Sequence, residues 1–169
     1  MNFSPFVMFN GDCEQAFGHY HSVFGGELEV LRYSDAPLLD KPEAQMDNKI
    51  MYAQLQTHDQ KLMGCDASDA MYQPQQGVLV AWQGETEAEV ERVFAALAQG
   101  GMVRQALNYA FWTPKYGLVE DQFGILWMFS CRKSDEYAGC KLKILDSLLD
   151  VRLFCPHVCG KSGFTGRIS

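Results

Sequence analysis

Histidine and cysteine are the residue types in this sequence that could bind a metal ion, but their spacing does not build a site. His19 and His21 are two residues apart in a segment of helical pattern, so they lie on different faces of the helix. His58 lies at an expected turn, where we predict a solvated side chain. The run Cys-x-His-x-Cys at residues 155–159 lacks the second pair of cysteines that zinc sites use. These residues therefore predict no metal centre.

Aromatic and amide side chains on expected strands favour a small-molecule site instead. An apolar, aromatic cavity with a few polar groups is the usual composition of such a site. Large aromatic residues also dominate protein cores, so simple core packing is the alternative role of each one. The candidate pocket residues are Tyr52, Gln54, Trp82, Trp112 and Trp127.

Residues 116–130 have the pattern of two short strands joined by the turn Asp121-Gln122-Phe123-Gly124. Asp and Gly supply the local hydrogen bonds and the permissive φ angle that a tight turn needs. The apolar run at 125–129 has the length of a strand and carries too many large side chains for a solvated edge. We expect a central hairpin with one face lining a pocket. We also expect Asp121 to form the turn rather than act as a catalytic base.

Several other functions lack their sequence signals. The chain contains no G-x-S-x-G, P-loop or G-x-G-x-x-G motif, which disfavours hydrolases, NTPases and dinucleotide-binding proteins. The net charge of -7 disfavours nucleic acid, which binds basic surfaces, and is a poor match for an anionic membrane. No apolar run approaches the roughly 18 residues of a membrane span. We therefore expect no nucleic-acid partner and no membrane partner.

Residues 1–67 have the pattern of one strand, one helix and three further strands. Asp12 followed by Gln15 predicts a helix that begins with a capping box. Apolar residues then recur at helical spacing until Gly25-Gly26, where glycine ends the helix. Short apolar or alternating runs predict strands at residues 3–10, 27–33, 49–57 and 61–66.

Residues 77–131 repeat this order. Thr86-x-x-Glu89 predicts a second capping box, and Gly100-Gly101 ends the second helix. The two expected caps, at 12 and 86, are 74 positions apart, and the glycine pairs, at 25 and 100, are 75 apart, which indicates an internal repeat. The alternative is two unrelated stretches that share common cap chemistry. Strands are expected at 77–83, at 102–112 and in the hairpin.

The fold class predicted by this repeat is α+β, with two βαβββ modules at residues 1–67 and 77–131. Residues 132–169 differ in kind: seven Lys and Arg against four Asp and Glu give +3, whereas the first 131 residues carry seven against seventeen, or -10. We expect a C-terminal appendage outside the repeat, either foreign to the native domain or poorly ordered. Residues 141–153 could form a short amphipathic helix within it.

Each half contains a set of residues that is typical of one known family. The set in the first half is Phe9-Asn10-Gly11, Glu14-x-Ala16, Tyr20 and Phe24-Gly25-Gly26, and the set in the second half is Trp112, Tyr116-Gly117 and Asp121-x-Phe123-Gly124-x-x-Trp127. Together they resemble the PhnB-like proteins of the vicinal oxygen chelate (glyoxalase/bleomycin resistance/dioxygenase) superfamily over roughly residues 3–131, with Gln122 at a position that is often Pro in relatives. The resemblance implies two βαβββ modules that form a cup-shaped mixed sheet, with the site in the cup.

The resemblance also implies where a metal would be bound. Metal-using relatives place about four His or Glu ligands on strands facing the cup, where the ion polarises vicinal substrate oxygens. The corresponding strands here contain no His, Asp or Glu; Gln54 and Gln56 are the nearest polar groups, and Met128 stands where a glyoxalase-type Glu would be. Some relatives carry a methyltransferase name, but no glycine-rich strand-to-helix turn suits a nucleoside cofactor. We expect no metal and no cofactor.

The resemblance and the residues together predict a metal-free protein that binds a small organic ligand in the cup. One alternative is a metal-dependent lyase, isomerase or dioxygenase of the same superfamily. Another is a structural or interaction protein with a filled cup. Exposed apolar sheet edges predict a homodimer, and the resemblance implies the same, since superfamily relatives often form homodimers. Six scattered cysteines and the lack of a signal-peptide pattern predict reduced thiols in a cytoplasmic protein.

Overall fold

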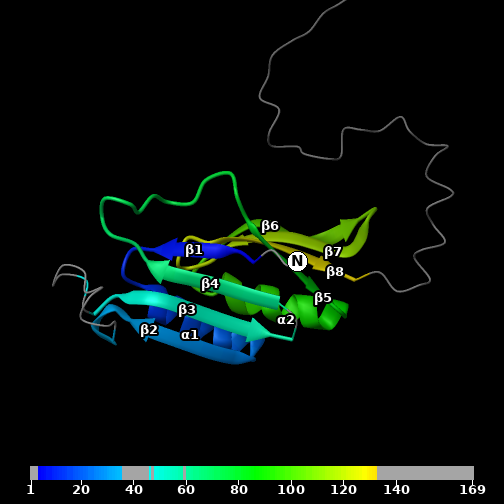
Figure 1. Cartoon of the computed structure of the whole chain (residues 1–169). Coiled ribbons are helices and arrows are strands. Elements are labelled where there is room, and N and C mark those ends of the chain that lie inside the picture. The colour runs from blue at the N-terminus through cyan, green and yellow to red at the C-terminus, as the bar shows by residue number, and fades with distance from the viewer. Residues whose placement is uncertain (1–3, 36–45, 47, 59, 133–169) are drawn as a thin grey trace, which may run out of the picture. The chain divides into compact units, whose positions relative to one another are not determined.

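The computed structural model describes residues 4–35, 46, 48–58 and 60–132 of the chain (Figure 1). The chain divides into two units, Met1–Arg132 and Lys133–Ser169. The second unit lies outside the described residues, and so do the expected helix at 141–153 and the Cys-x-His-x-Cys run at 155–159. No helix in the described part is long and apolar enough to cross a membrane.

The first module forms a four-stranded mixed sheet with one helix. The strand order is β1-β4-β3-β2, in which β1 and β4 are parallel and the other neighbours are antiparallel. A short 3₁₀ helix, η1 (Tyr33–Asp35), follows β2. The elements are β1 (Phe6–Phe9), α1 (Cys13–Phe24), β2 (Glu27–Arg32), β3 (Ile50–Thr57) and β4 (Gln60–Asp66).

The second module repeats this topology, with strand order β5-β8-β7-β6 and the same parallel pair at the equivalent edge, β5 with β8. The predicted α+β fold of two βαβββ modules is confirmed, and each module has a sheet of its own. Strand β5 begins later than expected because Gly77, at φ 71°, turns the chain in the left-handed region. The elements are β5 (Val80–Gly84), α2 (Glu87–Ala98), β6 (Met102–Ala110), β7 (Thr113–Glu120) and β8 (Leu126–Cys131).

Helix α1 is capped from a distant strand. Asp12 occupies the N-cap position but makes no side-chain cap hydrogen bond, so the predicted capping box is wrong. Asp66, at the end of β4, takes that role: its Oδ1 accepts from the backbone N–H groups of Gly11 at 2.9 Å and Cys13 at 3.1 Å. Its Oδ2 accepts from the N–H of Ile50 at 2.8 Å, which also ties β4 to the start of β3. One buried carboxylate thus fixes the helix to its sheet.

Helix α2 begins as predicted. The Thr86 hydroxyl accepts from the N–H of Glu89 at 3.2 Å, which satisfies one of the free donors of the first turn. The Glu89 carboxylate reaches back to the N–H of Glu85 at 2.9 Å. The second capping box is therefore confirmed. Its second hydrogen bond, to the Glu89 carboxylate, comes from the N–H of Glu85, one residue before the N-cap Thr86.

Each helix covers one face of its own sheet, and Figure 1 shows α1 behind β2 and β3. On β1, Val7 and Phe9 face this side and are 3% and 2% exposed, whereas Phe6 and Met8 are 48% and 41% exposed. We call the other side of each sheet, which carries no helix in the described part of the chain, the open face. Residues that alternate with the core along each strand lie on this open face.

The two modules share one hydrophobic core, because α1 of the first packs against strands of the second. The ring of Tyr20 lies 5.3 Å from that of Trp127, and Phe24 contacts both Trp127 at 5.4 Å and Trp82 at 5.8 Å. The Arg92 guanidinium of α2 also donates to the backbone carbonyl of Val23 at 3.2 Å. The helix-covered faces are thus buried, whereas the open face of the first sheet carries exposed side chains such as Phe6 and Met8.

Candidate functional site

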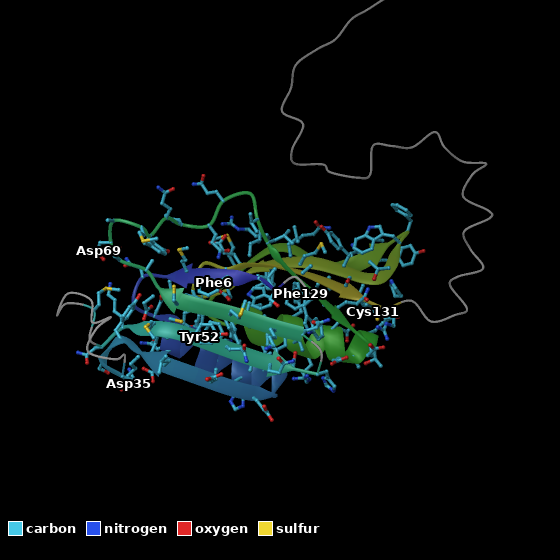
Figure 2. The ribbon with its side chains drawn as sticks, in the orientation of Figure 1. Phe6, Asp35, Tyr52, Asp69, Phe129 and Cys131 are labelled. Carbon is cyan, nitrogen blue, oxygen red and sulfur yellow. The ribbon has the colours of Figure 1, made fainter. Side chains whose placement is uncertain are left out.

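Tyr52 and Gln54, two of the predicted pocket residues, lie together on the open face of the first sheet (Tyr52 is labelled in Figure 2). The Tyr52 hydroxyl donates to Gln54 Oε1 at 2.9 Å, and the Lys61 ammonium donates to the same oxygen at 3.3 Å. Gln54 has two register partners on the neighbouring strands, Met63 on β4 and Glu29 on β2, so a thioether residue and a carboxylate residue flank the amide. No described residue accepts from the Gln54 amide nitrogen. We call Tyr52, Gln54 and Lys61 the glutamine cluster.

Trp82 and Trp127 lie on the opposite, helix-covered side. Trp127 is 2% exposed, and the ring of Trp82 packs against Phe129 at 5.9 Å. A Cβ placed at Gly84 would lie 2.8 Å from the Trp82 ring, which shows how closely this part of the core is packed. Both indoles therefore contribute to the core that joins the modules.

Trp112 lies apart from the other four residues, in the turn between β6 and β7. Its ring contacts Tyr116 edge to face, with centroids 5.1 Å apart. The structure thus brings together Tyr52 and Gln54 in one place and Trp82 and Trp127 in another. It does not gather all five candidate residues into one pocket.

Asp121 is buried at the β7–β8 turn and is only 4% exposed. Its Oδ1 accepts from the N–H groups of Phe123 and Ile125, both at 2.9 Å, as a turn-forming Asp does. Its Oδ2 accepts from the Tyr20 hydroxyl at 2.6 Å and from Trp127 Nε1 at 2.8 Å. Four donors fill this carboxylate, so it joins the modules instead of facing a substrate. The sequence signal for the role of Asp121 in joining the modules was its place with Trp127 in the motif Asp121-x-Phe123-Gly124-x-x-Trp127.

Tyr20 donates the hydrogen bond that crosses from one module to the other. Burial, and then the charge of the adjacent Asp121, raises the pKa of the Tyr20 hydroxyl well above its ordinary value. The phenol therefore keeps its proton and remains a donor at any physiological pH. The sequence analysis used Tyr20 only as one of the residues that carry the family resemblance and missed this contact, because its partner lies 101 residues away.

The three described cysteines are free and have raised pKa values. Burial is the main cause for Cys13 and Cys65, with the charge of Asp66 next. Burial and then the charge of Glu87 raise the pKa of Cys131. A thiol nucleophile needs a lowered pKa, so the raised pKa values disfavour a nucleophilic role for these three cysteines.

The side chains of the open faces do not fit a divalent metal ion. Among the described residues, no group of three or more His, Cys, Asp or Glu side chains could hold one. The polar atoms of the glutamine cluster belong to an amide, a phenol and an ammonium, and the neighbouring strands add one thioether residue, Met63, and a single carboxylate residue, Glu29. Divalent sites of this fold class require imidazole or carboxylate. No catalytic step through a metal follows from this set of residues.

A separate cavity of about 300 Å³ lies where the segment between the modules passes over β1 and the β7–β8 turn. It contains none of the five predicted pocket residues. Polar and apolar groups line it in about equal measure, and one wall carries an ion pair between Arg104 of β6 and Glu120 of β7. Its other lining residues include Met8, Tyr72, Gln75, Val78, Phe123 and Leu126.

Residues 1–130 match the protein family described as 3-demethylubiquinone-9 3-methyltransferase. The chain is 37% identical to the protein PA1353 from Pseudomonas aeruginosa, whose crystal structure aligns with 79% of this chain and 99% of that one at a TM-score of 0.73. A putative 3-demethylubiquinone-9 3-methyltransferase, PhnB protein, from Bacillus cereus is 26% identical, with 78% and 100% covered and a TM-score of 0.60. The protein YjdN of Escherichia coli is 26% identical over 79% of this chain and 97% of its own.

The family description names a methyltransferase, which requires a methyl donor. Helix N-termini bind anionic groups of cofactors through free N–H groups. At α1 the N–H groups of Gly11 and Cys13 are already bonded to the Asp66 carboxylate, whose negative charge disfavours an anionic group at this helix end. No transfer step follows from these residues.

The fold extends to proteins with little sequence likeness. The fosfomycin resistance protein FosX from Listeria monocytogenes is 9% identical and aligns with 81% of this chain and 96% of its own at a TM-score of 0.56. This likeness concerns the fold alone. With its first 130 residues matched by the family and its two βαβββ modules in place, the chain belongs to the PhnB-like family of the glyoxalase/bleomycin resistance superfamily.

Proposed function

We propose that this protein binds a small organic ligand at the open face of its sheets and that no protein-bound divalent ion takes part. The observation that supports this function is the glutamine cluster. A few polar groups in an apolar surrounding are the usual means of orienting a small ligand. The Gln54 amide oxygen already accepts hydrogen bonds from Tyr52 and Lys61, so the amide nitrogen is the donor best placed to orient a ligand.

The main competing function is a metal-dependent enzyme of the same superfamily. FosX, whose likeness is limited to the fold, has been crystallised with Mn(II). The glutamine cluster presents amide, hydroxyl and ammonium groups with a single flanking carboxylate residue, Glu29, and no group of three or more metal-ligating side chains among the described residues, which favours binding without a metal. A structural protein with a filled cup is the third candidate, but the exposed Phe6 and Met8 show open apolar surface rather than a filled one.

Native mass spectrometry and metal analysis of the protein as isolated test this proposal. We expect a bound small molecule in the wild type and its loss in Gln54→Leu, because the orienting amide is removed. The matched control is Gln15→Leu, the same change on the exposed side of α1, which should retain the ligand. Stoichiometric Zn, Ni, Mn or Fe that chelation removes would overturn the proposal.

We also propose that the protein is a homodimer and acts in the cytoplasm. Phe6, Met8 and Leu31, which are 48%, 41% and 38% exposed, leave apolar surface on the first sheet that a second copy would cover. Light scattering should therefore give twice the chain mass, and Phe6→Lys should lower it. A monomer at micromolar concentration would contradict this assembly. The free thiols of the described cysteines suit a reducing compartment.

A further inference from the structure

Ser130 on β8 differs from the other buried polar side chains of the second module and the first. Among the described residues, the polar or charged side chains that are buried belong to Asp66, Thr113, Asp121 and Ser130. The first three accept or donate hydrogen bonds inside the protein. Ser130 is 5% exposed, and its hydroxyl has no hydrogen-bond partner in the described part of the chain. Because a buried hydroxyl without a partner is costly, a group from outside the protein that bonds to it would be stabilised.

The Ser130 side chain lies on the open face of the second sheet. Its neighbour Phe129 packs against Phe94 of α2, with ring centroids 5.3 Å apart, so Phe129 points toward the helices. Successive side chains of a strand point to opposite faces, which directs Ser130 away from the helices. Its register partners are Gln83 on β5 and Tyr116 on β7, and they flank it on the same face. Both side chains are longer than serine, so the hydroxyl lies between two larger neighbours.

The groups that flank Ser130 are neutral and can both donate and accept. Neither the Gln83 amide nor the Tyr116 hydroxyl has a hydrogen-bond partner among the residues that the structure describes. The nearest charged residues along β5 and β8, Glu85 and Arg132, are bonded to each other at 2.8 Å. A ligand hydroxyl can accept from one neutral group and donate to another through a single oxygen. A charged group would lose its hydration here without meeting a free opposite charge.

Apolar and aromatic side chains adjoin this hydroxyl on the same face. The ring of Trp112 contacts Tyr116 edge to face at 5.1 Å. Met128 and Leu118 are register partners, and each lies two positions from Ser130 or Tyr116 on the same strand. Both are half-buried, so a hydrocarbon body placed over them would remove apolar surface from water.

We propose that the open face of the second sheet binds a neutral alcohol with an apolar body, whose hydroxyl bonds to Ser130. Gln83 is exposed, so its side chain can turn aside to admit such a ligand. The site shares no residue with the glutamine cluster on the first sheet. It adds a second position, of defined chemistry, to the proposed function, and binding at either position can fail while the other succeeds.

The test is an NMR titration of the full chain with three probes of similar size: benzyl alcohol, benzoate and benzylamine. We expect the wild type to bind benzyl alcohol about tenfold more tightly than either charged probe, because neither charge finds a partner. Ser130→Ala should weaken the binding of benzyl alcohol about tenfold, the effect of one lost hydrogen bond. Ser22→Ala is the matched control: it removes an exposed hydroxyl of α1 and should keep the wild-type affinity.

Thermal unfolding without a probe separates ligand binding from a structural role of Ser130. Ser130→Ala should leave the melting temperature unchanged or raise it, because its hydroxyl has no partner to lose. Thr113→Val should lower it, because the Thr113 hydroxyl bonds to the backbone of Cys131. Gln54→Leu should keep the affinity for benzyl alcohol, which distinguishes this site from the glutamine cluster.

Four outcomes would overturn the proposal. They are the absence of saturable binding, a preference for a charged probe, an undiminished affinity in Ser130→Ala, and a melting temperature that falls as far in Ser130→Ala as in Thr113→Val.

Discussion

At the residue scale, the hydrogen bond from Tyr20 to Asp121 is the most consequential single contact between the modules. The acceptor is a buried carboxylate, and the donor is a phenol in the core. Hydrogen bonds to charged groups contribute more than neutral ones, and a buried group left without its partner is costly. Side chains at this junction therefore determine how firmly the two halves are joined.

Replacing Tyr20 by Phe tests this contact directly. We expect the free energy of unfolding to fall by about 2 kcal/mol, because Asp121 loses a donor that water cannot easily replace. Urea denaturation followed by tryptophan fluorescence would measure it. The matched control is Tyr109→Phe, since Tyr109 is 63% exposed and its loss of a hydroxyl should be nearly neutral. Equal effects in the two variants would refute a special role for the contact.

The raised pKa values of the cysteines predict a decline in stability at alkaline pH. The folded chain keeps the Cys13 proton above its ordinary pKa of 9.0, whereas the unfolded chain releases it. The stabilisation is therefore complete below about pH 9 and falls as the pH rises further. Urea unfolding between pH 7 and 10.5 should show this decline, and Cys13→Ala should reduce its slope. A Cys13→Ala variant with the wild-type slope would exclude Cys13 as the source.

At the element scale, the two helices are anchored in different ways. Helix α2 uses a local capping box, which sequence spacing could predict. Helix α1 uses Asp66, which lies 53 residues from Cys13. A local motif cannot reveal a carboxylate brought in by strand pairing, which is why Asp12 was the wrong cap.

Asp66→Ala and Asp12→Ala form a matched pair that tests this difference. Asp66→Ala removes the acceptor of three backbone N–H groups, so we expect a loss of about 3 kcal/mol in the free energy of unfolding. Asp12→Ala removes no cap bond and should change it by less than about 0.5 kcal/mol. Thermal and urea denaturation measure both. If Asp12→Ala cost as much as Asp66→Ala, the long-range cap would not be the anchor.

Strand β8 shows why only part of the candidate site could be predicted. Its apolar run places large side chains on both faces of the strand. Polar and apolar residues therefore do not alternate, and the sequence does not indicate which face packs against the helices. Trp127 proved to face α1, together with Trp82 of β5. On β3, polar and apolar residues alternate, so Tyr52 and Gln54 could be assigned to one face from the sequence alone.

At the scale of the whole molecule, the repeated βαβββ order was predictable because caps and glycine pairs are local signals. The contacts that join the modules were not, since they pair residues about 100 positions apart, as with Tyr20 and Asp121. The cavity beside Arg104 was hidden for the same reason. Its walls come from β1, from the segment between the modules and from the second sheet.

The division of the chain at Arg132 predicts the outcome of limited proteolysis. Trypsin should produce a stable fragment that ends near Arg132, and its melting temperature should match that of the full chain within about 1 °C, because the core formed by the described residues lies before this point. Mass spectrometry and calorimetry would measure both. A fragment that melts several degrees lower would mean that residues 133–169 support the fold.

The bond between Tyr20 and Asp121 has no counterpart across the repeat. Counted from the helix starts, Tyr20 corresponds to Phe94, and counted from the ends of β3 and β7, Asp121 corresponds to His58. The two modules share a topology but not this pair, so the halves are complementary rather than interchangeable. A fusion of two copies of the first half would contain the Tyr20 phenol twice and lack the Asp121 carboxylate. A fusion of two copies of the second half would contain that carboxylate twice and lack the phenol. Recombination within this lineage must keep one of each, so the pair should be inherited or lost together.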